Sequence, residues 1–160
     1  MNRTGFTLIE TVIYSALLAV FIVGAFLFLN SILDGSVRTL ERNEVVANQE
    51  FVEQKLRWIL SGAKSVSVPS TGSSSSTLTL EGNATSTYPA SFSFASSAIR
   101  LSLASGTPVF LTNDRVSVIS FLAEHFSSSQ ASSSIVVSFA ISSANIPAVR
   151  TSSTNSYILP

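Results

Sequence analysis

The stretch Arg3-Thr4-Gly5-Phe6-Thr7-Leu8-Ile9-Glu10 decides the fold, because it joins a short polar head to a long apolar run. From Thr11 to Leu33 the chain carries no charged residue, and the next charge is Asp34. About 23 helical residues, each rising about 1.5 Å, match the ~30 Å hydrocarbon core of a bilayer. The sequence therefore predicts a membrane-spanning helix with a single carboxylate, Glu10, near its start.

The segment Gly5-Phe6-Thr7-Leu8-Ile9-Glu10 resembles the processing motif of type IV prepilins and type II secretion pseudopilins. In that family a prepilin peptidase cuts after the glycine, and the new N-terminal residue is methylated. The resemblance implies cleavage between Gly5 and Phe6 and N-methylation of Phe6. It also implies filament assembly through pairing of Glu10 with the terminal amine of a neighbouring subunit. It covers the chain closely up to about Gly35 and the remainder only in architecture.

Glu10 is the residue that an ordinary membrane anchor does not explain. A carboxylate inside a membrane span costs roughly 2.5 kcal/mol or more near the bilayer centre, and it usually has a partner. Four residues are about one helical turn, so a neighbouring helix shifted by one turn would bring its amine at Phe6 level with Glu10. Such a buried pair sets the register between helices more than it adds stability.

The resemblance also implies the partners and the location. The partners are the prepilin peptidase/methyltransferase, other pilin or pseudopilin subunits, an inner-membrane assembly platform, and membrane lipid before assembly. Arg3 is the only cation ahead of the apolar run, so the positive-inside rule places the N-terminus in the cytoplasm and the rest outside. We expect a single-pass protein of the inner (cytoplasmic) membrane that then enters an extracellular or periplasmic filament.

Composition argues against several classes of function. Charged residues make up 11% of the chain and the formal net charge is zero, so no basic surface for nucleic acid is evident. The chain has no cysteine, and His125 is its only histidine, which excludes thiol catalysis and a two-histidine metal site. Beyond the helix the acidic residues are scattered, and Asn113-Asp114 alone is too little for a calcium site. We expect no enzyme, no cofactor and no metal.

The helical pattern continues beyond the span. No proline precedes Pro69, and apolar residues recur at helical spacing, forming one stripe: Val45, Val52, Leu56, Ile59 and Ala63. Charged residues occupy much of the remaining surface, a pattern typical of a solvated face: Glu41, Arg42, Glu44, Glu50, Glu53, Lys55 and Arg57. Trp58 is predicted to cover the edge of the sheet's core; the alternative is a partner interface.

After the helix the apolar period changes to two, which predicts strands. The candidates are 65–68, 77–80, 92–94, 99–103, 109–111, 116–123 and 135–141. Short turns between them favour an antiparallel sheet with one wet face. The serine-rich tracts 70–76 and 127–134 are predicted to be loops. Residues 145–160 either add an edge strand or fray.

The predicted fold is α+β. A long N-terminal helix, with a transmembrane half and an amphipathic half, packs on an antiparallel β-sheet head, a pilin-like roll. The expected segments are a leader peptide over 1–5, a transmembrane or filament-core helix over 6–33, an amphipathic continuation over 34–64 and a β-rich globular head over 65–160.

The expected function is that of a structural subunit of a type IV pilus-like or type II secretion-like filament. Segments 49–54 and 115–121 resemble those of minor pseudopilins of the J or PilW type, and the lack of a C-terminal cysteine pair favours a minor over a major pilin. The alternative is a single-pass, membrane-anchored binding module that does not polymerise. The two differ in whether the chain is cut and assembled.

Overall fold

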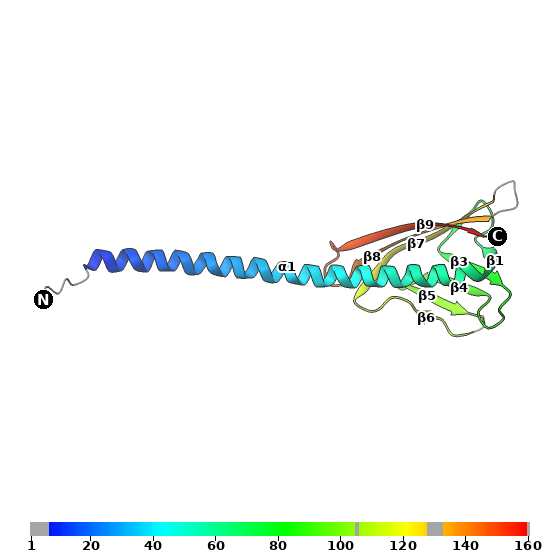
Figure 1. The fold of residues 1–160 in the computed structure, drawn as a ribbon, viewed down its shortest axis with the longest axis horizontal. Coiled ribbons are helices and arrows are strands. Elements are labelled where there is room, and N and C mark those ends of the chain that lie inside the picture. Colours follow the sequence, from blue (N-terminus) through cyan, green and yellow to red (C-terminus); the bar gives the residue numbers. More distant parts are fainter. Residues whose placement is uncertain (1–6, 105, 128–132, 160) are drawn as a thin grey trace. The chain divides into compact units, whose positions relative to one another are not determined.

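The computed structural model of the chain describes residues 7–104, 106–127 and 133–159. One long helix, α1 (Leu8–Gly62), precedes a series of antiparallel strands (Figure 1). The strands are β1 (Ala63–Val68), β2 (Ser74–Ser75), β3 (Thr77–Gly82), β4 (Ala90–Ala95), β5 (Ala98–Leu103), β6 (Val109–Phe110), β7 (Val116–Ser127), β8 (Ser133–Ser143) and β9 (Arg150–Leu159). The predicted α+β fold, a long N-terminal helix packed on antiparallel strands, is confirmed.

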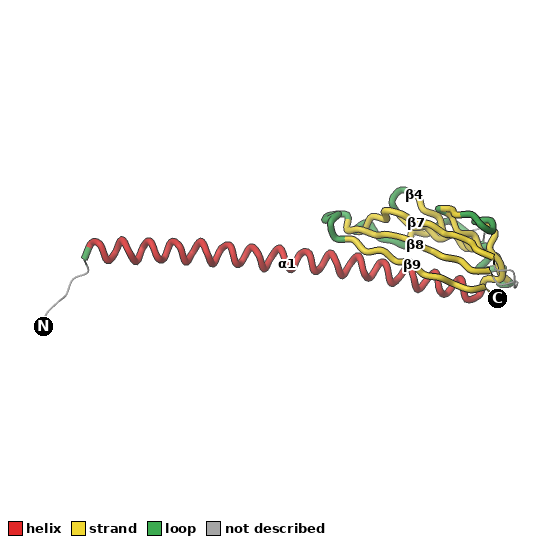
Figure 2. The backbone as a smooth tube through the Cα atoms, turned by 90° about the horizontal axis from the view of Figure 1, so that it is seen from above, coloured by secondary structure: helices red, strands yellow, loops and turns green. Residues whose placement is uncertain are grey.

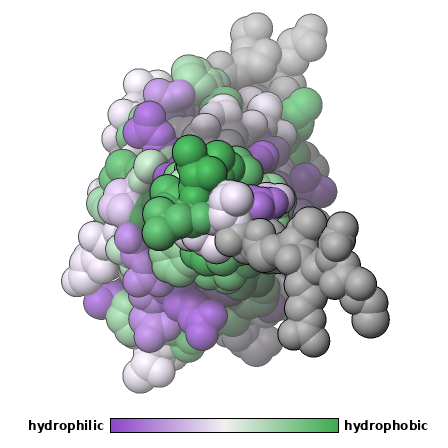
Figure 3. All heavy atoms as spheres, turned by 90° about the vertical axis from the view of Figure 1, so that its left-hand side faces the viewer, coloured by the Kyte–Doolittle hydropathy of each residue, from purple (hydrophilic) through white to green (hydrophobic). Residues whose placement is uncertain are grey.

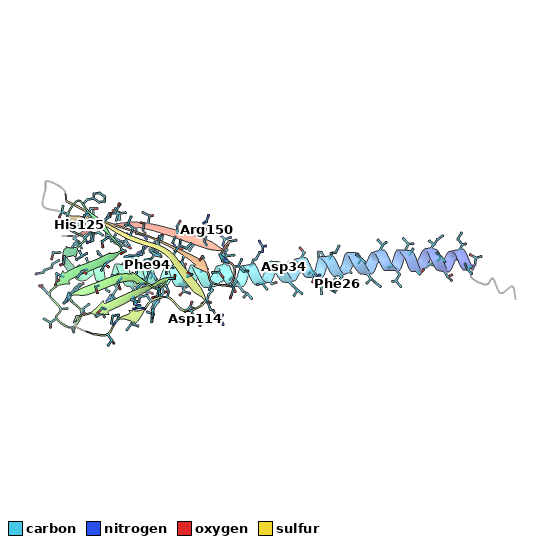
Figure 4. The ribbon with its side chains drawn as sticks, turned by 180° about the vertical axis from the view of Figure 1, so that it is seen from behind. Phe26, Asp34, Phe94, Asp114, His125 and Arg150 are labelled. Carbon is cyan, nitrogen blue, oxygen red and sulfur yellow. The ribbon has the colours of Figure 1, made fainter. Side chains whose placement is uncertain are left out.

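The chain divides into two compact units, Met1–Thr39 and Leu40–Pro160. In the first unit, the structure describes the part of α1 that we call the anchor helix, residues 8–39. Its large apolar side chains are exposed throughout, as for Phe21 at 73% and for Phe26, labelled in Figure 4, at 66%. Viewed from the N-terminal side, hydrophobic side chains gather on the nearest described turns of this helix (Figure 3).

The second unit contains two sheets. One has the strand order β1-β3-β4-β5-β6, and the other has the order β2-β7-β8-β9. In the second sheet, β7, β8 and β9 lie side by side in Figure 2. The sequence pattern predicted antiparallel strands but only one sheet. Apart from β2, which pairs with β7, the strands divide after β6, because β7 pairs with β2 and β8. The last 23 residues of α1 within this unit, 40–62, run along both sheets (Figures 1 and 2).

The apolar stripe of α1 forms the centre of the core. Val45, Val52, Leu56 and Ile59 are each at most 1% exposed, and Ala63, the first residue of β1, is also buried. They belong to one cluster with side chains from both sheets, including Leu78, Leu80, Phe92, Ile99, Ile135, Val137 and Ile141. The stripe predicted from its spacing is therefore confirmed.

Tyr88, in the connection between β3 and β4, covers the end of α1. Its ring lies against Gly82, where an added Cβ would be 2.5 Å from two ring carbons, and its hydroxyl oxygen would be 2.8 Å from a Cβ added at Gly62. The hydroxyl donates to the carbonyl of Ile59, which belongs to the last helical turn and has no partner in the helix. The helix ends at Gly62, so Ala63 and Lys64 are strand residues.

Two polar segments are more ordered than their composition suggests. The edge-strand alternative for the C-terminal residues is the one that forms, since β9 pairs with β8 from Arg150 to Leu159. The prediction that residues 70–76 form only a loop is wrong, because Ser74 and Ser75 pair with Glu124 and Ala123 of β7. Both segments complete the four-stranded sheet.

The prediction that Trp58 covers the edge of the core is wrong. Its side chain is 53% exposed, because the neighbouring residues Leu56 and Ile59 occupy the buried face of α1 and leave Trp58 outside it. The Nζ of Lys55 lies 5.5 Å from its ring centroid. The interface alternative for Trp58 therefore stays open.

Candidate functional site

Glu10 is the predicted site residue that the structure places, since Gly5 and Phe6 lie outside the described residues. It sits in the first turn of α1, half-buried, with one carboxylate oxygen 3.4 Å from the hydroxyl of Tyr14. Its backbone N–H donates to the hydroxyl oxygen of Thr7 at 3.4 Å. The carboxylate therefore lies on the helix surface, one turn below a tyrosine hydroxyl.

Thr7 and Glu10 have the spacing of a helix capping box. Thr7 precedes the first helical residue, Leu8, and its carbonyl accepts the first helical hydrogen bond, from Thr11. A threonine at this position commonly accepts from the N–H three residues on, where a glutamate is favoured. An acidic residue in the first turn also interacts favourably with the helix dipole. Thr7 and Glu10 thus also begin α1, a local role that the Thr-x-x-Glu spacing in the sequence indicates.

The anchor helix is the second feature of the site. Among the described residues, α1 is the one helix long and apolar enough to cross a membrane, by length and composition. None of its most apolar stretch is buried within the chain. Such a surface requires apolar surroundings, because leaving it in water costs about 25 cal/mol per Å² of apolar area. Membrane anchoring is compatible with this helix.

The interleaved charges of α1 predicted a solvated face in the second unit. Several of these acidic side chains instead accept hydrogen bonds from the head. Glu41 accepts hydrogen bonds from Ser143 (2.6 Å) at the end of β8 and from Asn145 (3.0 Å) just beyond it. One helical turn further on, Glu44 accepts from the side chain of Asn113 (2.5 Å), which precedes β7. These carboxylates hold two loops of the head against the helix.

The same arrangement continues along β9. Thr151 donates to Gln49 at 2.7 Å, and Ser153 donates to Glu53 at 2.5 Å. Gln49 in turn donates to Glu53 at 2.9 Å, which links the two contacts. We call the residues on both sides the polar seam: Glu41, Glu44, Gln49 and Glu53 of α1 with Asn113, Ser143, Asn145, Thr151 and Ser153 of the head.

Two seam carboxylates have lowered pKa values. Hydrogen bonds from Ser143 and then Asn145 lower the pKa of Glu41 below its ordinary value of 4.5. For Glu53, burial alone would raise the pKa, but hydrogen bonds from Ser153 and Gln49 outweigh it and leave the pKa lowered. Both groups therefore favour the ionised form in the folded head.

We expect the seam to make the head sensitive to acid. Because the folded pKa values lie below 4.5, the seam contributes its full stability above pH 4.5 and loses it as the pH falls through the folded values. The free energy of unfolding, measured by urea titration of the detergent-solubilised chain, should fall on acidification below pH 4.5. Glu41→Gln with Glu53→Gln should flatten this dependence, whereas Glu50→Gln, at an exposed position on the same helix, should not. If the free energy of unfolding of the double variant fell as steeply below pH 4.5 as that of the wild type, the acid sensitivity would not come from the seam.

His125 has a structural position in the head (Figure 4). It is 5% exposed, and its Nδ1 lies 3.0 Å from the carbonyl oxygen of Pro69. Backbone bonds from Gly72 to His125 and from His125 to Ser73 hold the same segment on β7. Within residues 7–104, 106–127 and 133–159, no group of three or more His, Cys, Asp or Glu side chains is placed to hold a metal ion.

Comparison with known proteins identifies no relative. No family model matches the sequence. No curated protein and no solved structure matches the chain either.

Proposed function

We propose that the chain is a structural subunit, of the minor pilin or pseudopilin kind, of a type IV pilus-like or type II secretion-like filament. The chain is cut after Gly5, methylated on Phe6 and assembled through α1, with Glu10 facing the amine of a neighbouring subunit. The observation that carries the proposal is the exposed apolar anchor helix with one carboxylate in its first turn, directly after the Gly5-Phe6 motif.

The exposed anchor helix fits both apolar environments that assembly requires, the membrane and the filament. Before assembly lipid covers it, and in the filament neighbouring helices do. Both are apolar, so moving the helix between them changes the hydrophobic energy little, and packing between helices becomes the driving term. The proposed partners are the peptidase/methyltransferase, the assembly platform of the inner membrane and the other subunits. The head carries a structural and not a catalytic role.

The capping box favours a second candidate. If the carboxylate of Glu10 serves only to cap α1, the chain is a single-pass membrane-anchored binding module that never polymerises. That module predicts an uncut chain in the membrane.

The mass of the mature protein tests the proposal. Purified from the native host, the chain should lack residues 1–5 and carry one added methyl group on Phe6. A Gly5→Val variant, in which a bulky residue replaces the cleavage-site glycine, should keep the full mass. A full-length, unmethylated wild-type chain would overturn the filament proposal and favour the anchored module.

A further inference from the structure

Exposed aromatic side chains gather on one side of the head. We call Phe51, Lys55 and Trp58 of α1 together with Val109 and Phe110 of β6 the aromatic patch. Phe51 is 43% exposed and Phe110 57%. Single exposed apolar residues are ordinary on a protein surface, but a cluster that includes tryptophan and phenylalanine is typical of a protein interface.

Cations already lie on the rings of this patch. The Nζ of Lys55 is 5.4 Å from the ring centroid of Phe51 and 5.5 Å from that of Trp58, so one ammonium contacts both rings. The guanidinium of Arg100, in β5, is 4.6 Å from the ring centroid of Phe110. These cation–π contacts orient the aromatic side chains and concentrate positive charge at the patch.

A hollow of about 470 Å³ lies within the patch. Its lining is almost wholly apolar and contains one charged residue, Lys55, and no acidic one: Phe51, Lys55, Leu101, Leu103, Gly106, Thr107, Val109, Phe110 and Leu111. The hollow is therefore an apolar groove, and its one charge is the positive charge of Lys55, with no carboxylate in the lining. The fitting occupant is apolar and carries a negative charge.

The anchor helix of a second copy offers that combination. Asp34 is exposed, and Leu33 and Val37 beside it are 57% and 50% exposed. Among the described residues of the anchor helix, the acidic ones are Glu10 and Asp34, and Glu10 is bonded to Tyr14. Asp34 and Val37 are three residues apart, so they share one side of the helix. This turn therefore presents apolar side chains beside one anion, and the nearest cation on the helix, Arg38, lies four residues beyond Asp34.

We infer that the aromatic patch of one copy binds the turn around Asp34 of a second copy, with Lys55 facing Asp34. The inference rests on the proposed function. Apolar contact supplies the affinity, whereas an exposed ion pair contributes little energy and mainly selects the neighbour and its register. Two different surfaces of the same chain meet, so the contact is head-to-tail and generates a ring or an open helical filament.

Cysteine pairs test the contact directly, because the chain has no cysteine of its own. Two differently tagged full-length chains, one with Asp34→Cys and one with Lys55→Cys, are expressed together in the native host. A short bis-maleimide should join them into a mixed dimer in the assembled fraction. The matched control replaces Lys55→Cys by Arg42→Cys, at an exposed cation of the same helix outside the patch, and should give no mixed dimer.

Charge reversal supplies the second readout. Lys55→Glu should lower the amount of assembled protein about fivefold, by replacing attraction with repulsion at an exposed pair. Adding Asp34→Lys to that variant should restore assembly, and Arg42→Glu should leave it unchanged. Assembled chains that lack residues 1–5 but give no mixed dimer, or in which Lys55→Glu has no effect, would overturn this contact and leave the filament proposal standing. Uncut chains that do not assemble would overturn both.

Discussion

Replacing Glu10 with glutamine is expected to abolish filament assembly while the protein is still made, inserted and cut. Glutamine keeps the capping pattern with Thr7, because Gln serves as well as Glu three residues after the cap. It removes only the negative charge. A neighbour's amine is then left unpaired in apolar surroundings, and loss of one member of a buried ion pair costs about 3–5 kcal/mol. Filament yield by shearing and electron microscopy should fall more than about 100-fold.

A cap variant separates the two roles of Glu10. Thr7→Ala removes the hydroxyl that accepts the N–H of Glu10 but leaves the carboxylate in place. It should cost about 1 kcal/mol of helix stability, the usual effect of losing such a cap, and filaments should still form. If Glu10→Gln assembled like the wild type, the carboxylate would be a helix cap and not an assembly residue.

Replacing Gly82 with alanine is expected to destabilise the head by about 3 kcal/mol, at the upper end for overpacking. The added Cβ would lie 2.5 Å from two ring carbons of Tyr88, a distance at which the ring has to move. Displacing the ring would also weaken the hydrogen bond from the Tyr88 hydroxyl to the carbonyl of Ile59 at the end of α1. The measurement is the urea midpoint of the full chain in detergent, followed by circular dichroism.

Two comparisons isolate the cause. Gly35→Ala is the matched control, because nothing lies within 4 Å of a Cβ at Gly35, and alanine is the better helix former by about 1 kcal/mol. In a Tyr88→Ala background, Gly82→Ala should cost much less, since the clashing ring is gone. An unchanged cost in that background would show that the backbone at Gly82, and not Tyr88, sets the penalty.

The helix and its buried stripe were predictable because both depend on local spacing. Val45, Val52, Leu56 and Ile59 lie on one face of any α-helix, whatever packs on them. The end of the helix was not predictable from the same signal, because Tyr88 contacts it from beyond β3. The division of the strands into two sheets likewise depends on which strands pair, and alternation within a strand does not encode its partner.

The polar seam was missed for a similar reason. In the sequence Glu41 and Glu53 look the same as Glu50, which is exposed. Their partners Ser143 and Ser153 lie 102 and 100 residues away along the chain. Serine and threonine on the inner side of β9 gave no apolar signal, so the strand looked like a polar tail.

Part of the candidate site could be predicted from the sequence. The motif at Gly5-Phe6 and the carboxylate of Glu10 stand out because a charge is costly in an apolar helix. The aromatic patch does not stand out, since Phe51 and Trp58 fit a core as well as a surface. Only the packing of Leu56 and Ile59 toward the sheets shows that Trp58 lies outside.

The seam also makes completion of the head depend on the last strand to be synthesised. β9, which begins at Arg150 (Figure 4), carries the seam residues Thr151 and Ser153. The anchor helix leaves the ribosome long before these residues are made. The carboxylates of Glu41 and Glu53 consequently stay solvated and without their serine partners until the last strand has been translated. Contacts this distant in sequence slow folding, so the head completes its fold only after β9 has been made.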